Sequence, residues 1–199
     1  MVSRFRLAVA LSLIVFAVGA CSSEPVTAPT PRPPGSDAPA PPPMPAPSPA
    51  PGISSDGAFF TYVTQTQPFS AYAPFPNLGV GADGTLPASS AHQPFIRVTM
   101  NAAAAGALQN GKLPRGTAFP DGSVIFKEVL TSSRTVSVYA VMYKDRANTN
   151  AGNGWLWAEY RPGGGVEFSM TNRGSACTGC HSLAQGPQND FVRIFERQR

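Results

Sequence analysis

The fold is decided by residues 123–161, where three strand-like runs follow one another: SVIFKEVL (residues 123–130), TVSVYAVMYK (residues 135–144) and WLWAEYR (residues 155–161). Each run is rich in β-branched or aromatic residues and is bounded by glycine-containing or polar turns. Consecutive strands with short connections favour an antiparallel sheet.

Further elements are expected on both sides of this region. Residues 94–101 (PFIRVTMN) alternate like a strand, and Asn101 is placed to cap a short alanine-rich helix that ends near Asn110. Towards the C-terminus we expect one helical turn and a last strand over residues 190–196. The predicted class is α+β, mainly antiparallel β-sheet with a few short helices.

The predicted helical turn carries the motif Cys177-Thr178-Gly179-Cys180-His181. Two cysteines three residues apart, followed directly by histidine, are the attachment signature of haem c. Residues at i and i+3 of a helix lie on one side, so both thiols can bond to one porphyrin edge. His181 would then ligate the haem iron. The sequence therefore predicts one covalently bound haem c.

Three other roles are open to this motif. Structural zinc needs four ligands, and His92 is the one further histidine or cysteine outside the N-terminal segment. A thioredoxin-like redox pair is expected near a βαβ pattern, which is missing from the sequence. A plain disulfide between Cys177 and Cys180 is the third alternative.

The position of the motif does not suit a helical electron-carrying cytochrome c, which has it near the N-terminus and a methionine ligand downstream. No methionine follows His181, while Met100, Met142 and Met170 precede it. A methionine on a strand is more often core filler. We therefore expect a five-coordinate haem with one open face.

The N-terminus resembles a bacterial lipoprotein signal over residues 1–20. Arg4 and Arg6 precede an apolar run, and Val-Gly-Ala stands before Cys21, the predicted lipidated residue. An ordinary signal peptide with an incidental cysteine is the alternative. Lipid on Cys21 and haem on the other two cysteines would use all three. We expect anchoring to a bacterial membrane, facing the periplasm, with Ser22 favouring the outer membrane.

A proline-rich linker is predicted over residues 21–52. Thirteen of the chain's 22 prolines fall within residues 22–52, where large apolar side chains are almost missing, so this segment cannot bury enough surface to fold. Residues 53–199 are long enough for one haem domain. That domain has 12 Lys and Arg against 9 Asp and Glu without a basic run, so no nucleic-acid partner is expected.

Several motifs together resemble the cytochrome P460 family, which includes the cytochromes c′-β. They are FPDGSVIFKE (residues 119–128), Lys144-Asp145, GWLWAEY (residues 154–160), the Cys-x-x-Cys-His motif and NDFVR (residues 189–193). The resemblance implies an antiparallel-sheet haem fold that is commonly a homodimer, with the motif histidine as proximal iron ligand.

The resemblance also assigns a role to Lys127. In family members that oxidise hydroxylamine, the matching lysine is cross-linked to the porphyrin. Lys127 shares a strand face with Ile125 and Val129, and a buried amine loses its proton readily, as a nucleophile must. The alternative is a lysine at the strand edge that extends to solvent.

The chain departs from the oxidising members at one position. They place a carboxylate in the distal pocket where this chain has Ala140. An apolar distal pocket, as in the branch that binds nitric oxide and carbon monoxide, is therefore expected. Arg97 matches a distal arginine, with a surface salt bridge as the alternative. His92 is either a sixth ligand or a hydrogen-bonding surface residue.

Two functions follow. One is a redox enzyme that acts on hydroxylamine, nitric oxide or a related nitrogen species. The other is a haem protein that binds small gases or transfers electrons without catalysis. A small diatomic or nitrogenous ligand and a redox partner are expected, and the sequence names neither.

Overall fold

A computed structural model describes residues 52–88 and 91–199 of the chain. The predicted signal segment, Cys21 and nearly all of the predicted linker lie outside the described residues. Within those two ranges, none of the helices combines the length and the apolar character needed to cross a membrane.

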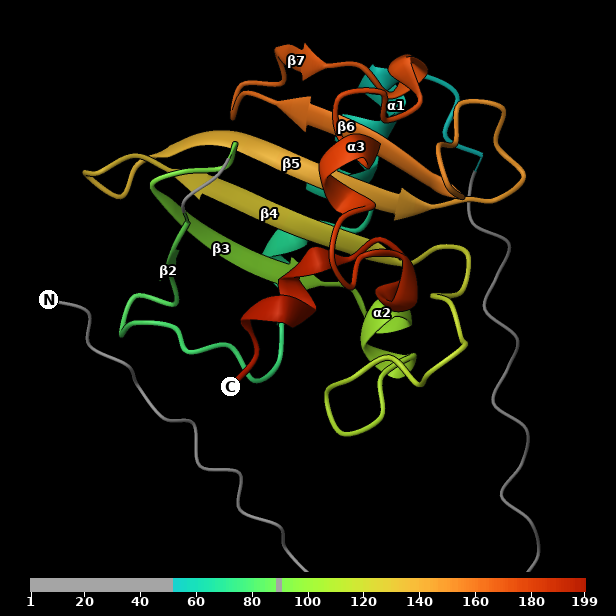
Figure 1. Cartoon of the computed structure of the whole chain (residues 1–199). Helices are drawn as coiled ribbons and strands as arrows, with labels where there is room; N and C mark the ends of the chain where they lie inside the picture. The colour runs from blue at the N-terminus through green and yellow to red at the C-terminus, as the bar shows by residue number, and fades with distance from the viewer. Residues whose placement is uncertain (1–51, 89–90) are drawn as a thin grey trace, which may run out of the picture. The chain divides into compact units, whose positions relative to one another are not determined.

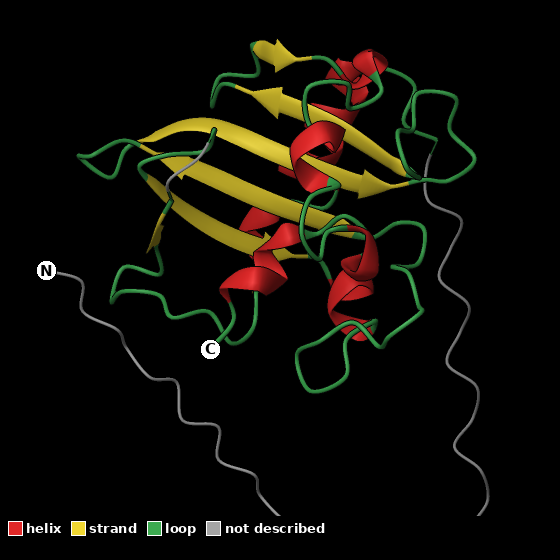
Figure 2. Ribbon diagram, viewed as in Figure 1, coloured by secondary structure: helices red, strands yellow, loops and turns green. Residues whose placement is uncertain are grey.

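One antiparallel sheet organises the described part (Figures 1 and 2). Its strand order is β1-β3-β4-β5-β6-β7, and β2 pairs with β3. The strands are β1 (Ala73–Pro74), β2 (Leu86–Pro87), β3 (Phe95–Met100), β4 (Val124–Leu130), β5 (Val136–Lys144), β6 (Trp155–Tyr160) and β7 (Val166–Phe168). The prediction of a mainly antiparallel α+β fold is confirmed, and the four predicted central strands are correct to within one residue at each end.

The helices are short, and several are single turns. They are α1 (Asp56–Thr61), the π-helical η1 (Tyr62–Thr66), η2 (Phe69–Ala71), α2 (Ala102–Gly106), η3 (Met170–Asn172), α3 (Thr178–His181), η4 (Pro187–Asn189) and η5 (Arg193–Arg197). The predicted cap is confirmed, because the Asn101 side chain accepts a hydrogen bond from the Ala104 amide. Helix α2 nevertheless ends at Gly106, earlier than predicted.

The prediction of a last strand over residues 190–196 is wrong. Asp190 and Phe191 have φ values of 50° and 65°, a left-handed conformation that interrupts an extended run. The chain then forms the 3₁₀ turn η5, which buries Ile194 in the core.

The two faces of the sheet have different coverings. The rear face packs against α1 and η1 through an aromatic core that includes Phe59, Tyr62, Tyr143 and Tyr160. The front face packs against α2 and the C-terminal segment, and Figure 1 shows α2 and α3 in front of the sheet with α1 behind it. Protein therefore covers much of the rear face, and the front face contains the main cavity of the described residues.

Candidate functional site

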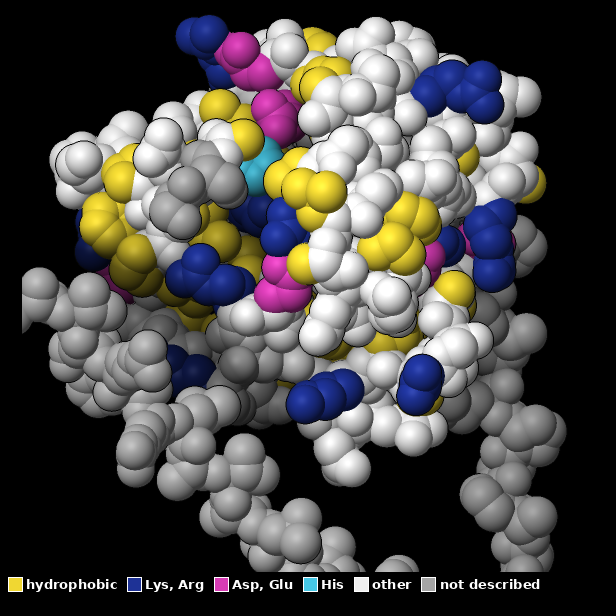
Figure 3. Space-filling model, in the orientation of Figure 1, with side chains coloured by type: hydrophobic (Ala, Val, Ile, Leu, Met, Phe, Trp, Pro, Cys, Tyr) yellow, Lys and Arg dark blue, Asp and Glu magenta, His cyan; other side chains and the backbone are white. Residues whose placement is uncertain are grey.

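A cavity of about 510 Å³ lies between the front face of the sheet and the C-terminal segment. Its volume is within the usual range for small-molecule and cofactor pockets, roughly 300–1,000 Å³. Strands β3, β4, β5 and β6 contribute one wall, and α3 and η5 contribute the opposite one. Figure 3 shows hydrophobic side chains around a hollow on this face, with cationic and histidine side chains beside it.

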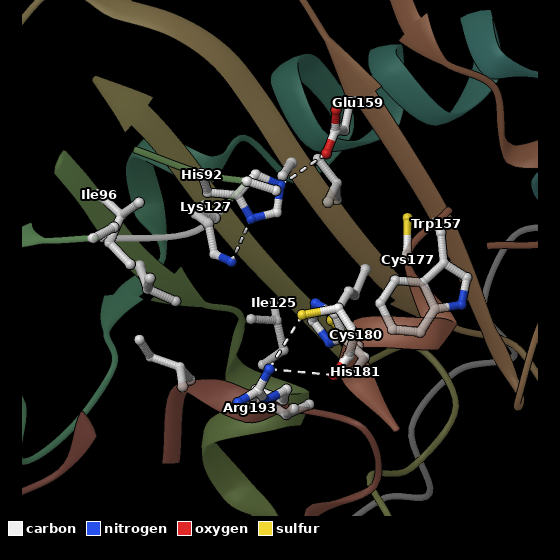
Figure 4. Close-up of a pocket in the computed structure, with 18 of the residues that line it drawn as sticks. His92, Ile96, Ile125, Lys127, Trp157, Glu159, Cys177, Cys180, His181 and Arg193 are labelled. Atoms are coloured by element: carbon white, nitrogen blue, oxygen red, sulfur yellow. Dashed lines mark hydrogen bonds and ion pairs between the residues drawn. The ribbon is translucent and has the colours of Figure 1, made fainter. Parts of the chain in front are cut away.

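Helix α3 brings the three predicted haem-binding residues to the cavity. Cys177, Cys180 and His181 all line it (Figure 4). Both thiols are free, so the structure has no disulfide at this motif. The turn before α3 packs closely against the sheet: Gly174 has a φ of 69°, and a Cβ there would overlap the Trp157 ring. The Trp157 ring in turn lies edge-on to the His181 ring, and the two ring centroids are 4.8 Å apart.

The tautomer of His181 follows from its one hydrogen bond. Its Nδ1 lies 2.6 Å from the carbonyl oxygen of Phe191, and a carbonyl can only accept, so Nδ1 carries the proton. Nε2 then keeps its lone pair. Burial lowers the pKa of His181 to about 4, so the ring is neutral at ordinary pH, as metal ligation requires.

A buried ion pair holds the residue next to Phe191. The Asp190 carboxylate accepts a hydrogen bond from Lys144 Nζ at 2.7 Å and another from the Phe119 amide at 2.9 Å. The Asp190 carbonyl accepts from the Trp155 indole at 2.9 Å. These contacts fix the left-handed turn that presents the Phe191 carbonyl to His181, so they orient the imidazole from a distance.

The residues present fit a covalently attached haem. Two free thiols lie one helical turn apart, a neutral imidazole has an unused Nε2, and the cavity beside them is largely apolar. Burial raises the pKa of Cys177 to about 11, so this thiol is protonated at neutral pH. A bare metal site is not favoured, because no group of three His, Cys, Asp or Glu side chains converges within residues 52–88 and 91–199.

Lys127 lies on the sheet wall of the cavity, as predicted from strand alternation. It belongs to one cross-strand row, made of Val98, Lys127, Ala140 and Glu159, in which each residue pairs with the next. Directly opposed residues of neighbouring strands share a face. Burial lowers the pKa of Lys127 to about 8, so a substantial fraction of its amine is neutral near that pH.

The expectation of an apolar pocket without a carboxylate was wrong. Glu159 lines the cavity from β6, one strand away from Ala140. His92 joins it to Lys127: His92 Nε2 lies 2.8 Å from Glu159 Oε1, and His92 Nδ1 lies 3.1 Å from Lys127 Nζ. His92 therefore forms hydrogen bonds, but inside the cavity rather than on the outer surface. Only the strand register reveals that Glu159 neighbours Ala140.

The structure does not bring Arg97 to the cavity. Arg97 pairs with Glu128 across β3 and β4, and its guanidinium lies 2.7 Å from the Glu128 carboxylate. Both belong to the row next to that of Lys127, and side chains in adjacent rows point to opposite faces. This arrangement is the surface salt bridge that was the alternative for Arg97.

Two arginines that the sequence analysis did not single out also line the cavity, Arg193 and Arg197. Arg193 donates to the carbonyl and to the Sγ of Cys180 at 3.2 and 3.1 Å, and it pairs with Glu196 at 2.7 Å. Arg193 ends the motif of residues 189–193, which was the available signal. Cations at this edge suit carboxylates such as haem propionates.

A comparison with protein families identifies the family of this chain. No curated protein matched the sequence. A family profile described as cytochrome P460 matches residues 84–193, a span that includes β2 to β7, the Cys-x-x-Cys-His helix and the beginning of η5. This match covers more than half of the chain and contains every residue that lines the cavity except Ile194, Glu196 and Arg197. The chain therefore belongs to the cytochrome P460 family.

Proposed function

We propose that the protein is a mono-haem c-type cytochrome whose open haem face binds or transforms small nitrogen species, such as nitric oxide or hydroxylamine, or other small gases. Membership of the family already makes it a cytochrome that binds haem and iron. In the proposal, Cys177 and Cys180 form the thioethers and His181 ligates the iron.

One observation carries the proposal: His181 is the one histidine with an unused ring nitrogen. The chain has two histidines. Nδ1 of His181 is bonded to a carbonyl and its Nε2 is unused, whereas both nitrogens of His92 are engaged by Lys127 and Glu159. Met142 also lines the cavity, but it is 7% exposed and packs in the front core cluster. One axial ligand leaves the other iron position for a small molecule.

Whether Lys127 is cross-linked to the porphyrin distinguishes reversible ligand binding from a reaction on the ligand. Its depressed pKa supplies a neutral amine, the form that can bond to a porphyrin carbon. A cross-link would change the macrocycle and shift the ferrous Soret band to the red. Without it, the spectrum would be that of ordinary haem c, and reversible gas binding would be favoured.

The test is a ferrous absorption spectrum of the haem-loaded chain, recorded beside its intact mass. We expect the mass of the chain plus one haem, a five-coordinate ferrous spectrum, and conversion by carbon monoxide and nitric oxide to ligand-bound spectra. The Lys127→Met variant is the control for the cross-link, because it must give an ordinary haem c spectrum. A stable six-coordinate spectrum in both oxidation states would contradict the proposal and favour electron transfer without catalysis.

We further propose that Cys21 carries a lipid that tethers the domain to a bacterial membrane on its periplasmic side, with the outer membrane favoured. The motif at Cys21 and the proline-rich segment after it support this proposal. Metabolic labelling with a fatty-acid analogue should mark the wild-type chain and not the Cys21→Ala variant. Membrane fractions without the wild-type protein would contradict it. A homodimer, implied by the family, can be tested on the same material by its mass in solution.

A further inference from the structure

Three polar side chains form a continuous chain on the otherwise largely apolar sheet wall of the cavity. Lys127 contacts His92, and His92 contacts Glu159, at 3.1 and 2.8 Å (Figure 4). The three residues come from β4, from the loop before β3 and from β6. The pairing register fixes Lys127 and Glu159 two strands apart, and His92 connects their side chains.

The hydrogen bonds run in one direction. A lysine ammonium can only donate, so His92 Nδ1 accepts from it. His92 Nε2 then carries the ring proton and donates it to the Glu159 carboxylate, which can only accept when ionised. A donor, a ring that both accepts and donates, and a terminal acceptor are the components of a proton-transfer chain.

The far end of this chain of contacts is accessible to water. All three side chains line the cavity, and those of His92 and Glu159 are 22% and 28% exposed. Water can therefore reach Glu159 at the acceptor end, while Lys127 at the donor end faces the space where a ligand would bind.

We propose that Lys127, His92 and Glu159 form a proton-transfer path between the haem pocket and solvent. The step moves one proton from Lys127 Nζ to His92 Nδ1 while the Nε2 proton of His92 passes to Glu159 Oε1. Two N–H bonds break, one N–H and one O–H bond form, and no electrons are exchanged. Glu159 then releases its proton to water, and the reverse sequence delivers a proton to the pocket.

This inference rests on the proposed function and applies to the chain in which the Lys127 amine stays free, because a nitrogen cross-linked to the porphyrin could not donate as a lysine ammonium. The path would then serve a bound nitrogen species that gains or loses protons. It gives the pocket the acid–base group that the Ala140 position lacks. The lowered pKa of Lys127 agrees with it, because an amine that titrates near pH 8 can give up its proton. The pKa of Glu159 is lowered by its hydrogen bond to His92, which keeps it an ionised acceptor.

Other charged and titratable groups face the same space and must be separated from the path. They come from α3 and the C-terminal segment: Cys177, Cys180, His181, Arg193, Glu196 and Arg197. Thioether formation removes both thiols from titration, and iron ligation removes His181. Arg193 and Glu196 form a mutual ion pair. None of the variants in the experiment below changes either residue, so their contribution stays constant.

The experiment is a pH jump on the haem-loaded ferric chain, from pH 7 to pH 9, followed by Soret absorbance in a stopped-flow instrument. His92→Gln is the decisive variant, because an amide can accept from Lys127 and donate to Glu159 but cannot exchange a proton between its two ends. We expect the same final spectrum as the wild type, reached about 10²-fold more slowly. Glu159→Gln should also slow the change.

Glu128→Gln is the matched control. It is the same substitution on the same sheet, but Glu128 pairs with Arg97 on the row facing away from the cavity. It should keep the wild-type rate. The wild-type change should also be slower in D₂O, which tests the path without any variant.

The outcomes separate the path from the proposed function. Wild-type rates in both His92→Gln and Glu159→Gln, a wild-type spectrum unchanged between pH 7 and pH 9, or no slowing in D₂O would each overturn the path. A five-coordinate, gas-binding haem would then leave the proposed function intact. A six-coordinate wild-type spectrum that becomes five-coordinate in His92→Gln would overturn both, because it would make His92 an iron ligand.

Discussion

Two lysines on the front face of the same sheet meet carboxylates in different ways. Lys144 contacts Asp190 directly at 2.7 Å, and the two side chains are 3% and 8% exposed. Lys127 reaches Glu159 only through His92, and both of these partners are partly open to solvent. The first cluster supports the turn that contacts His181, and the second lines the cavity.

The difference separates a lysine in a direct, buried ion pair from a lysine that contacts its carboxylate only through a histidine. Asp190 also accepts the Phe119 amide, so the buried charges are matched and hydrogen-bonded, as a stable buried pair must be. Lys127 lacks a directly contacting carboxylate, and burial lowers its pKa to about 8. The same residue type thus supports the turn that orients His181 at one position and takes part in a hydrogen-bond chain at the other.

The largest expected effect comes from removing one partner of the buried pair. Lys144→Met should lower the free energy of unfolding by about 3–5 kcal/mol, because it leaves the Asp190 carboxylate buried and uncompensated. Urea unfolding measures this loss. In an Asp190→Asn background the same substitution should cost clearly less, and an equal cost in both backgrounds would show that the two side chains do not interact.

The matching substitution at Lys127 should have the opposite sign. Lys127→Met should stabilise the apoprotein at pH 7 by about 1–3 kcal/mol, since the wild-type chain must keep a charge in a site that disfavours it. Between pH 8 and 10.5 the unfolded lysine binds more protons than the folded one, so wild-type stability rises with pH in that window. The gain from Lys127→Met should therefore shrink there, as urea unfolding at several pH values would measure. A destabilised Lys127→Met variant at pH 7 would remove the contrast with Lys144.

A smaller effect is expected from Glu159→Gln. The Glu159 charge raises the pKa of Lys127 against the effect of burial, so its removal should lower that pKa further below about 8. The pH dependence of Lys127 acylation by a small amine reagent, read by peptide mass spectrometry, measures this. If the pH dependence of Lys127 acylation is the same in Glu159→Gln as in the wild type, His92 does not couple the two residues.

The smallest effect is expected at Arg97. Its ion pair with Glu128 is partly exposed, with a 36% exposed arginine side chain, and such pairs contribute about 0–1 kcal/mol. Arg97→Gln should therefore change the unfolding free energy by less than about 1 kcal/mol and leave the haem spectrum unchanged. A change in the haem spectrum would indicate that Arg97 does act in the haem pocket.

The sheet was predictable because its strands carry their signal locally. Residues 123–130 and 155–161 are rich in β-branched or aromatic side chains, a composition that suits a buried pleated surface. The Cys-x-x-Cys-His helix was predictable for a similar reason, because haem c attachment requires this spacing of two cysteines and a histidine. By contrast, residues 190–196 look like a strand, but the buried contacts of Asp190 impose a left-handed turn that no local pattern shows.

The polar cluster was not predictable from residue spacing. Glu159 and Lys127 are 32 positions apart in the chain, and they share a face only because β4, β5 and β6 pair in one register. His92 lies in a loop, where local sequence does not determine the direction of a side chain. Contacts of this kind depend on tertiary register, which the sequence does not encode locally.

The row of Val98, Lys127, Ala140 and Glu159 has a consequence for how such a pocket changes during evolution. Each residue occupies the same level of the sheet on its own strand, and directly opposed Cβ atoms lie only about 4.5–5.5 Å apart. Two substitutions, one that adds a carboxylate at Ala140 and one that removes it at Glu159, would move the group by a single strand spacing. Descendants of one ancestor can thus keep an acid in the same space while its position in the sequence jumps by nineteen residues, which would make the function look lost in a column-by-column comparison.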